Sequence, residues 1–236
     1  MKKIIFCIVF CCLAYTTVSA DNLVKNGSFE DGLPGSDYIT IFPGLTDLND
    51  WTIEGTNVDV VISPFWNASD KFRSVDLNGT DWATGTAPGG VSQTIATVPG
   101  LTYEVTFDLS GNAWSGGNSP DAKLMTVSVD AAGSTPQQYT YTVPVLNSTN
   151  MAYDSNTYYF VATGSITKLT FHSDIAGMAG PVIDNVTMDG ITAQICHRDF
   201  GKRTQKTIIV GLSAIAAHIA HGDPSPAGPC VGGSKF

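Results

Sequence analysis

The sequence has little of what most enzymes and nucleic-acid-binding proteins need. Charged residues make up 14% of the chain, and long stretches rich in Glu, Lys and Leu at helical spacing are missing. This absence argues against a parallel α/β sheet. The G-x-S-x-G elbow, the phosphate-binding glycine loop and a paired catalytic Cys/His signature are also absent. Among these catalytic arrangements, the sequence does not exclude the pair of carboxylates that a glycosidase uses, because any Asp and Glu can lie close together in the folded chain.

The first 20 residues have the three parts of a secretory signal peptide. Lys2 and Lys3 precede an apolar run over residues 4–14, and a small-x-small ending follows at residues 18–20. The run is shorter than the roughly 20 residues that a membrane-spanning helix needs, and no other stretch is long and apolar enough. We expect residues 1–20 to be removed and the protein to be secreted and extracellular, without a transmembrane segment; a retained anchor is the alternative.

The balance of charge is acidic, with 21 Asp and Glu against 12 Lys and Arg and a formal net charge of −9. Loss of Lys2 and Lys3 with the signal peptide takes this charge to −11, which disfavours a nucleic-acid partner or an anionic membrane. The same cleavage leaves Cys196 and Cys230 as the only cysteines. In an oxidising compartment we expect these two to form a disulfide.

Short alternating runs separated by Gly, Pro, Asn and Asp dominate from residue 22 to about residue 190. In residues 102–109, apolar and polar side chains alternate, which is typical of a half-buried strand. Similar runs occur at residues 58–62, 75–78, 91–95, 125–129, 139–143, 158–161, 169–171 and 182–188. Many short strands at this spacing predict an all-β protein built as an antiparallel sandwich or barrel.

The pattern changes after Gly190, and residues 191–236 contain both remaining cysteines and three of the four histidines. Residues 212–221 have the composition of a short helix, and Gly222 follows as a stop signal. A segment of this size holds little core by itself. We therefore expect a small C-terminal appendage with one short helix, which the disulfide closes.

Several short phrases in the first part of the chain resemble those of a known family and follow its order. They are NLVKNGSFEDG at residues 22–32, SVDLNG at 74–79, GVSQT at 90–94, YEVTFDLSGN at 103–112 and VIDNV at 182–186. The set resembles galactose-binding-like jelly-roll modules, specifically the bacterial choice-of-anchor type C domain, which is related to a plant cell-wall family of undefined function. This resemblance implies an extracellular jelly-roll β-sandwich over residues 21–190, associated with cell-surface polymers and not known as an enzyme.

The C-terminal appendage resembles a second recurrent secreted segment. Its form is C-H … A-A-H-x-x-H-G-D … G-P-C, and it covers residues 196–230 of this chain. No role is assigned to this segment by the resemblance.

The first candidate site is a structural calcium site formed by Glu30 and Asp184. Asp184 shares a strand face with the apolar residues 182, 186 and 188, where an unpaired carboxylate is costly. In carbohydrate-binding modules with both phrases, the matching residues hold calcium, and carboxylate oxygens suit that ion. The alternative is that Asp184 accepts backbone amides at a strand end while Glu30 is solvated.

The second candidate site is a glycan-binding surface on loops. Trp66, Trp82 and Trp114 lie in turn-rich segments, where indole faces offer platforms for sugar rings and Asn112 offers hydrogen bonds. We expect these residues to bind an extracellular polysaccharide, a glycoprotein or another cell-surface polymer, whereas Trp51 belongs to the core. The alternative is that each loop indole plugs an end of the sandwich. If the indoles are buried, the sequence favours a different function, that of a structural or protein-interaction component of the cell surface or extracellular matrix.

The third candidate site is a metal site in the appendage. His218 and His221 are three residues apart on the expected helix and therefore face the same way. Together with His197, Asp223 or a cysteine they form a possible zinc site. Packing and helix-end roles are favoured instead, because the H-x-x-H phrase lacks the Glu of zinc proteases and a disulfide removes both thiolates.

Overall fold

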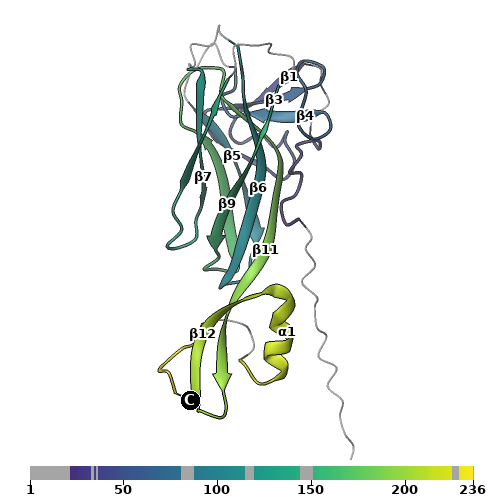
Figure 1. Ribbon diagram of the computed structural model, residues 1–236. Helices are drawn as coiled ribbons and strands as arrows, with labels where there is room; N and C mark the ends of the chain where they lie inside the picture. The colour runs from purple at the N-terminus through teal and green to yellow at the C-terminus, as the bar shows by residue number, and fades with distance from the viewer. Residues whose placement is uncertain are drawn as a thin grey trace, which may run out of the picture.

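The computed structural model describes residues 22–32, 35, 37–80, 88–114, 120–143, 151–224 and 229–235. This part of the chain is nearly all β-strand and folds into two antiparallel sheets that pack face to face (Figure 1). The predicted all-β sandwich is therefore confirmed. Residues 1–20, interpreted as a signal peptide, lie outside the described residues.

The first sheet has the strand order β1-β3-β4-β11-β6-β9, and β12 pairs with the C-terminal part of β11. The second sheet has the strand order β2-β5-β10-β7-β8. Strands of the first sheet are β1 (Tyr38–Ile41), β3 (Val58–Ile62), β4 (Arg73–Asp76), β6 (Leu101–Gly111), β9 (Asp154–Val161), β11 (Pro181–Asp199) and β12 (Thr204–Gly211). Strands of the second sheet are β2 (Thr52–Gly55), β5 (Gly89–Ala96), β7 (Ala122–Val129), β8 (Gln137–Thr142) and β10 (Ile166–Ser173). Each run predicted from alternation corresponds to a strand, whereas β1, β2 and β12 correspond to none of these runs.

The core lies between the two sheets, where the inward faces of the strands meet. On β6 the alternation predicted from the sequence points the apolar face inward, and Phe107 is fully buried. Its ring packs edge-on against Tyr139 of β8 at 5.0 Å and Phe171 of β10 at 5.2 Å. Trp51 is buried beside Phe29, with ring centroids 5.2 Å apart, which confirms its predicted place in the core.

One strand, β11, joins the sandwich to the C-terminal appendage. It was predicted to end near residue 188 but continues through Gly190 to Asp199. Its first half pairs with β6 as far as Ala193, opposite Leu101, and its second half pairs with β12. The appendage therefore projects from one end of the sandwich on a shared strand (Figure 1).

The appendage is a two-stranded ribbon covered by α1 (Leu212–Ala220). The helix matches the predicted segment within one residue and is followed by Gly222, whose φ of +107° lies in the left-handed region. Leu212 and Ile215 of the helix pack against the sandwich core. A disulfide joins Cys196 to Cys230, as predicted, with an S–S distance of 2.07 Å.

Within the described ranges, none of the helical structure is both long and apolar enough to cross a membrane.

Candidate functional site

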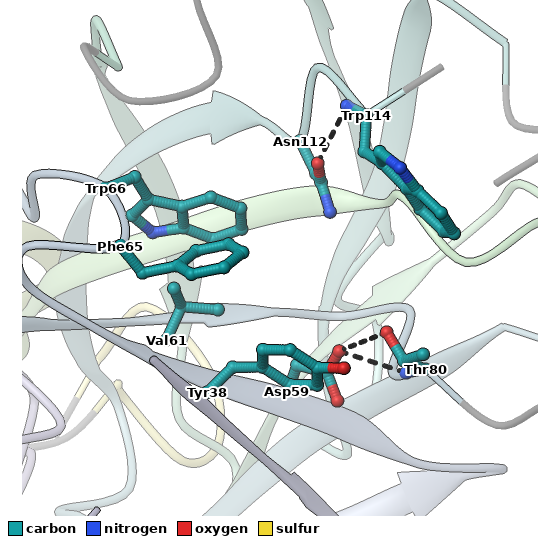
Figure 2. A pocket seen from close by; sticks show the side chains of 8 residues that line it. All are labelled: Tyr38, Asp59, Val61, Phe65, Trp66, Thr80, Asn112 and Trp114. Atoms are coloured by element: carbon teal, nitrogen blue, oxygen red, sulfur yellow. Dashed lines mark hydrogen bonds between the residues drawn. The ribbon is translucent and has the colours of Figure 1, made fainter. Parts of the chain in front are cut away.

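A pocket of about 220 Å³ lies at the end of the sandwich opposite the appendage. The register fixes this position, because β6 starts beside Ala193 near the appendage and ends at Gly111 opposite Pro181, at the other end. The pocket is lined by Tyr38, Asp59, Val61, Phe65, Trp66, Thr80, Asn112 and Trp114 (Figure 2). These residues come from β1, β3 and the segments that follow β3, β4 and β6.

Four of the eight residues that line the pocket are aromatic. Phe65 lies edge-on to Tyr38 at 5.7 Å and to Trp66 at 5.8 Å between ring centroids. Figure 2 shows Trp114 across the pocket from this group. Tyr38, Phe65 and Trp114 are all partly accessible to solvent, with 39% of Trp114 exposed. The pocket therefore presents apolar flat surfaces from two sides.

A buried carboxylate supplies the polar floor. Asp59 comes from the apolar strand β3, and its Oδ1 accepts a hydrogen bond from Thr40 Oγ1 at 2.6 Å. Its Oδ2 accepts hydrogen bonds from Thr80 N at 3.0 Å and Thr80 Oγ1 at 2.7 Å. Burial raises the pKa of Asp59 above its ordinary value, although these hydrogen bonds oppose the shift. The contacts hold Thr80 at the pocket rim.

Asn112 connects the rim to a second buried acid below it. Its Nδ2 donates to Asp76 Oδ2 at 2.8 Å, and its Oδ1 accepts the backbone N–H of Trp114 at 2.9 Å. Burial, together with the charge of Asp59 on the neighbouring strand, raises the pKa of Asp76 to about 8. Both ends of the Asn112 amide are thus used to position the Trp114 segment.

The four predicted glycan-binding residues differ from one another in where they lie in the structure. Trp114 and Asn112 line the pocket, and their contact with a ligand stays a prediction. Trp66 also lines it, but the expectation of an exposed indole there is wrong, because only 2% of the residue is accessible. Its Nε1 donates to Ser74 Oγ at 2.9 Å, so it packs as the alternative predicted. Trp82 lies outside the described residues.

Sequence reasoning did not single out Tyr38, Phe65, Asp59 or Thr80. Tyr38 lies on a four-residue strand beside turn residues, too short for alternation to be recognised. Asp59 did carry a signal, because a carboxylate within the otherwise apolar strand VDVVI needs a local partner. Phe65 immediately precedes Trp66, but pairing it with Tyr38 requires the fold.

Glu30 and Asp184, the predicted calcium ligands, hold the same short segment. Glu30 Oε1 accepts the backbone N–H groups of Phe72 and Arg73, each at 2.8 Å. Asp184 Oδ2 accepts the N–H groups of Ser69 and Asp70, also at 2.8 Å each. The two carboxylates therefore clamp residues 69–73 against the sandwich.

These contacts leave fewer oxygen lone pairs for calcium, because an N–H donor and a cation compete for the same lone pairs. The Oδ2 of Asp184 also accepts Ser69 Oγ at 3.1 Å, and its Oδ1 accepts the Asn185 N–H at 2.7 Å. Burial raises the pKa of Asp184 to about 7. For Asp184 the contacts favour the alternative in which this side chain accepts backbone amides. Glu30 was expected to be solvated in that alternative, but it also accepts two backbone N–H groups. Calcium at these residues stays a prediction.

The comparisons with known proteins concern the sandwich. Residues 22–189 match the family described as "Protein of unknown function (DUF642)". Halomucin of Haloquadratum walsbyi (strain DSM 16790 / HBSQ001) is 28% identical over 173 residues, which are 71% of this chain; the chain spans 2% of halomucin's length. The choice-of-anchor type C assignment and the resemblance of the C-terminal motif to a recurrent secreted segment stay predictions.

Similar solved structures include three carbohydrate-binding modules. TmCBM61 in complex with β-1,4-galactotriose is 17% identical, with 72% of this chain and 99% of that chain covered and a TM-score of 0.43. The family 16 carbohydrate-binding module-2 is 20% identical, with coverages of 71% and 99% and a TM-score of 0.42. The CBM22-1 xylan-binding domain from Paenibacillus barcinonensis Xyn10C is 16% identical, with coverages of 74% and 97% and a TM-score of 0.41.

Proposed function

The chain belongs to the DUF642 family of proteins of unknown function, and we propose that it is a secreted, non-catalytic module that binds an extracellular polysaccharide or glycoprotein. The observation that carries this proposal is the pocket in which exposed aromatic rings meet a buried polar floor. Sugar rings have apolar C–H faces and polar edges, so a site for them combines flat aromatic surfaces with a few fixed polar groups.

The dimensions of the pocket favour a small part of a glycan. A volume of about 220 Å³ lies below the roughly 300–1,000 Å³ typical of sites for drug-sized ligands. One sugar unit or the end of a chain fits this space, with one face of the ring against Trp114 or Tyr38. The Thr80 hydroxyl and the Asp59 carboxylate lie beside it for hydroxyl groups.

The presence of one carboxylic acid among the described lining residues supports binding without catalysis. Glycoside hydrolysis of the usual kind uses a pair of carboxyl groups on either side of the scissile bond. Among the described residues that line the pocket, Asp59 is the only carboxylic acid, and both of its oxygens accept hydrogen bonds from neighbouring threonines. A disulfide between Cys196 and Cys230 supports an oxidising, extracellular location.

The test is binding of the mature protein to a glycan array and to insoluble polysaccharides, including xylan and β-1,4-galactan. Trp114→Ala and Tyr38→Ala should each weaken binding about 5–30-fold, because an aromatic contact contributes on the order of 1–2 kcal/mol with its buried area. The melting temperature should change little, because both side chains are exposed.

Tyr159→Ala is the matched control. Tyr159 is exposed on β9, opposite Glu104 in the half of β6 nearer the appendage, so its loss should leave glycan binding unchanged. Equal binding by Trp114→Ala and the wild type, or no retention of the wild type on any glycan, would replace this proposal with a structural or protein-interaction role.

A further inference from the structure

We propose that the appendage contains a zinc site. Its four ligands are His197, His218, His221 and Asp223. One potential ligand atom of each of these side chains lies within 4.8 Å of all the others. This cluster lies outside the glycan pocket and at the other end of the molecule from it.

The carboxylate of Asp223 is the centre of the cluster. Its Oδ2 lies 2.9 Å from His218 Nδ1, 3.0 Å from His197 Nδ1 and 4.0 Å from His221 Nε2. The three imidazole rings approach one another closely, with centroids 5.3–5.5 Å apart. Tetrahedral zinc with bonds of about 2.0–2.2 Å places its ligand atoms about 3.3–3.6 Å apart. In the proposed site, the four ligand atoms, which now lie within 4.8 Å of one another, would move to that spacing on binding zinc.

The fold brings the four residues together from two elements. His197 lies on β11, while His218 and His221 are three residues apart at the end of α1 and so share one helix face. A turn at Gly222 then returns the chain to Asp223. A Cβ at position 222 would lie 2.7 Å from the ring of Phe200, so this close turn requires glycine.

The orientation of Asp223 is fixed by a contact on its other oxygen. Its Oδ1 accepts the backbone N–H of Arg198 at 2.7 Å, which leaves Oδ2 directed at the histidines. The side chain is only 1% exposed. A buried carboxylate needs a compensating partner, and a supporting hydrogen bond that orients a ligand is characteristic of metal sites.

Hydrogen bonding alone accounts for only part of this arrangement. Two of the three histidine nitrogens are within hydrogen-bond distance of Oδ2, but His221 Nε2 at 4.0 Å is not. A metal ion gives all three rings a common partner. Three imidazoles and one carboxylate suit zinc, and four protein ligands indicate a structural rather than a catalytic site.

The proposed site has a clear structural consequence. The appendage has little core of its own, so a metal that joins β11 to the end of α1 would hold the helix on the ribbon. The disulfide at the neighbouring Cys196 ties the same strand to residue 230. Metal and disulfide would thus fasten different segments to one strand.

The test is zinc binding by the mature, disulfide-intact protein after treatment with a chelator and removal of the chelator. Calorimetric titration with zinc chloride should give one zinc per chain. His221→Gln should weaken binding roughly 100-fold or more, because loss of even a supporting partner costs about 10–100-fold. His221 is 51% exposed, so this variant should keep its fold, which circular dichroism and disulfide mapping would check.

Two further variants keep the experiment decisive. His172→Gln removes the fourth histidine, which is partly exposed on β10 in the sandwich, and should leave zinc affinity unchanged. His221→Asp retains a metal ligand and should bind zinc more tightly than His221→Gln, which a purely structural role for the ring does not predict. Absence of zinc binding by the wild type at micromolar concentrations, or equal affinity of His221→Gln and wild type, would overturn the proposal.

Discussion

The sandwich and the appendage are each stabilised by a different kind of interaction. In the sandwich, large side chains such as Phe107 and Phe171 are fully buried between two sheets. Beyond Gly190, the buried apolar side chains in the described part of the chain are those of Ala193, Ile195 and Cys196. No residue of β12 is buried. The appendage thus has very little core, although it contains a ribbon and a helix.

This difference follows from size. A unit of about 45 residues removes too little apolar surface from water to offset the conformational entropy of ordering it. Small units of this kind rely on cross-links, and the appendage has a disulfide, a strand shared with the sandwich and a cluster of polar contacts around Asp223. Changes in the core should therefore affect the whole protein, whereas changes in the cross-links should affect the appendage.

The largest expected effect is on the sandwich core. Phe107→Ala should lower the free energy of unfolding by about 3–5 kcal/mol, because it removes a fully buried ring and leaves a cavity. Ile209→Ala on exposed β12 should change it by less than about 0.5 kcal/mol. Urea unfolding followed by tryptophan fluorescence measures both. Similar losses in the two variants would contradict the contrast between core and appendage.

The disulfide should act on the appendage alone. Replacing Cys196 and Cys230 together with serine removes a link between residues separated by 34 positions, which contributes roughly 3–4 kcal/mol. In the presence of a chelator, amide hydrogen exchange should accelerate in β12 and α1 while the strands of the second sheet stay protected. If the whole sandwich melted at a much lower temperature, the appendage would be an integral part of its core.

Sequence patterns predicted the longer strands of the sandwich better than the short strands β1 and β2 at the sheet edges. Alternation is strong where a strand has one buried face, as in residues 102–109, and those strands were found. The four-residue strands β1 and β2 are too short to show a period. The continuation of β11 past Gly190 was missed, because its outer half pairs only with β12 and has a mixed, partly exposed pattern.

The candidate site was predicted only in part, for a different physical reason. Composition identified Trp114 and Asn112 as residues of a turn-rich loop, and the structure brings both to the pocket. Whether an indole such as Trp66 is covered depends on side chains from distant segments, here Met151 and Val182. The convergence of His197 with the helix histidines likewise depends on the pairing of β11 with β12, which no local pattern encodes.

A smaller effect is expected from the buried acid Asp76 in the sandwich. Its folded-state pKa of about 8 lies well above the value of about 3.9 for an unfolded chain, so the folded state holds the proton more tightly. The stabilisation is therefore complete below about pH 4 and is lost as the pH rises towards 8. We expect the free energy of unfolding to fall continuously as the pH rises over this range.

Urea unfolding at several pH values, with two variants, tests this expectation. Asp76→Asn cannot ionise and should flatten the pH dependence, even if its stability is lower throughout. Asp154→Asn, an exposed carboxylate on β9, should keep the wild-type slope. A slope unchanged in Asp76→Asn would mean that other groups cause the pH dependence.

The smallest expected effect concerns the clamp that Glu30 forms on residues 69–73. Glu30→Gln keeps an oxygen for the N–H groups of Phe72 and Arg73 but removes the charge that strengthens both bonds, so we expect a loss of about 1 kcal/mol. If the carboxylate serves only amides, this loss should be the same in millimolar calcium and in chelator. A stabilisation by calcium that grows with its concentration and vanishes in Glu30→Gln would instead establish the predicted calcium site, because an ion that binds only the folded state stabilises it by mass action.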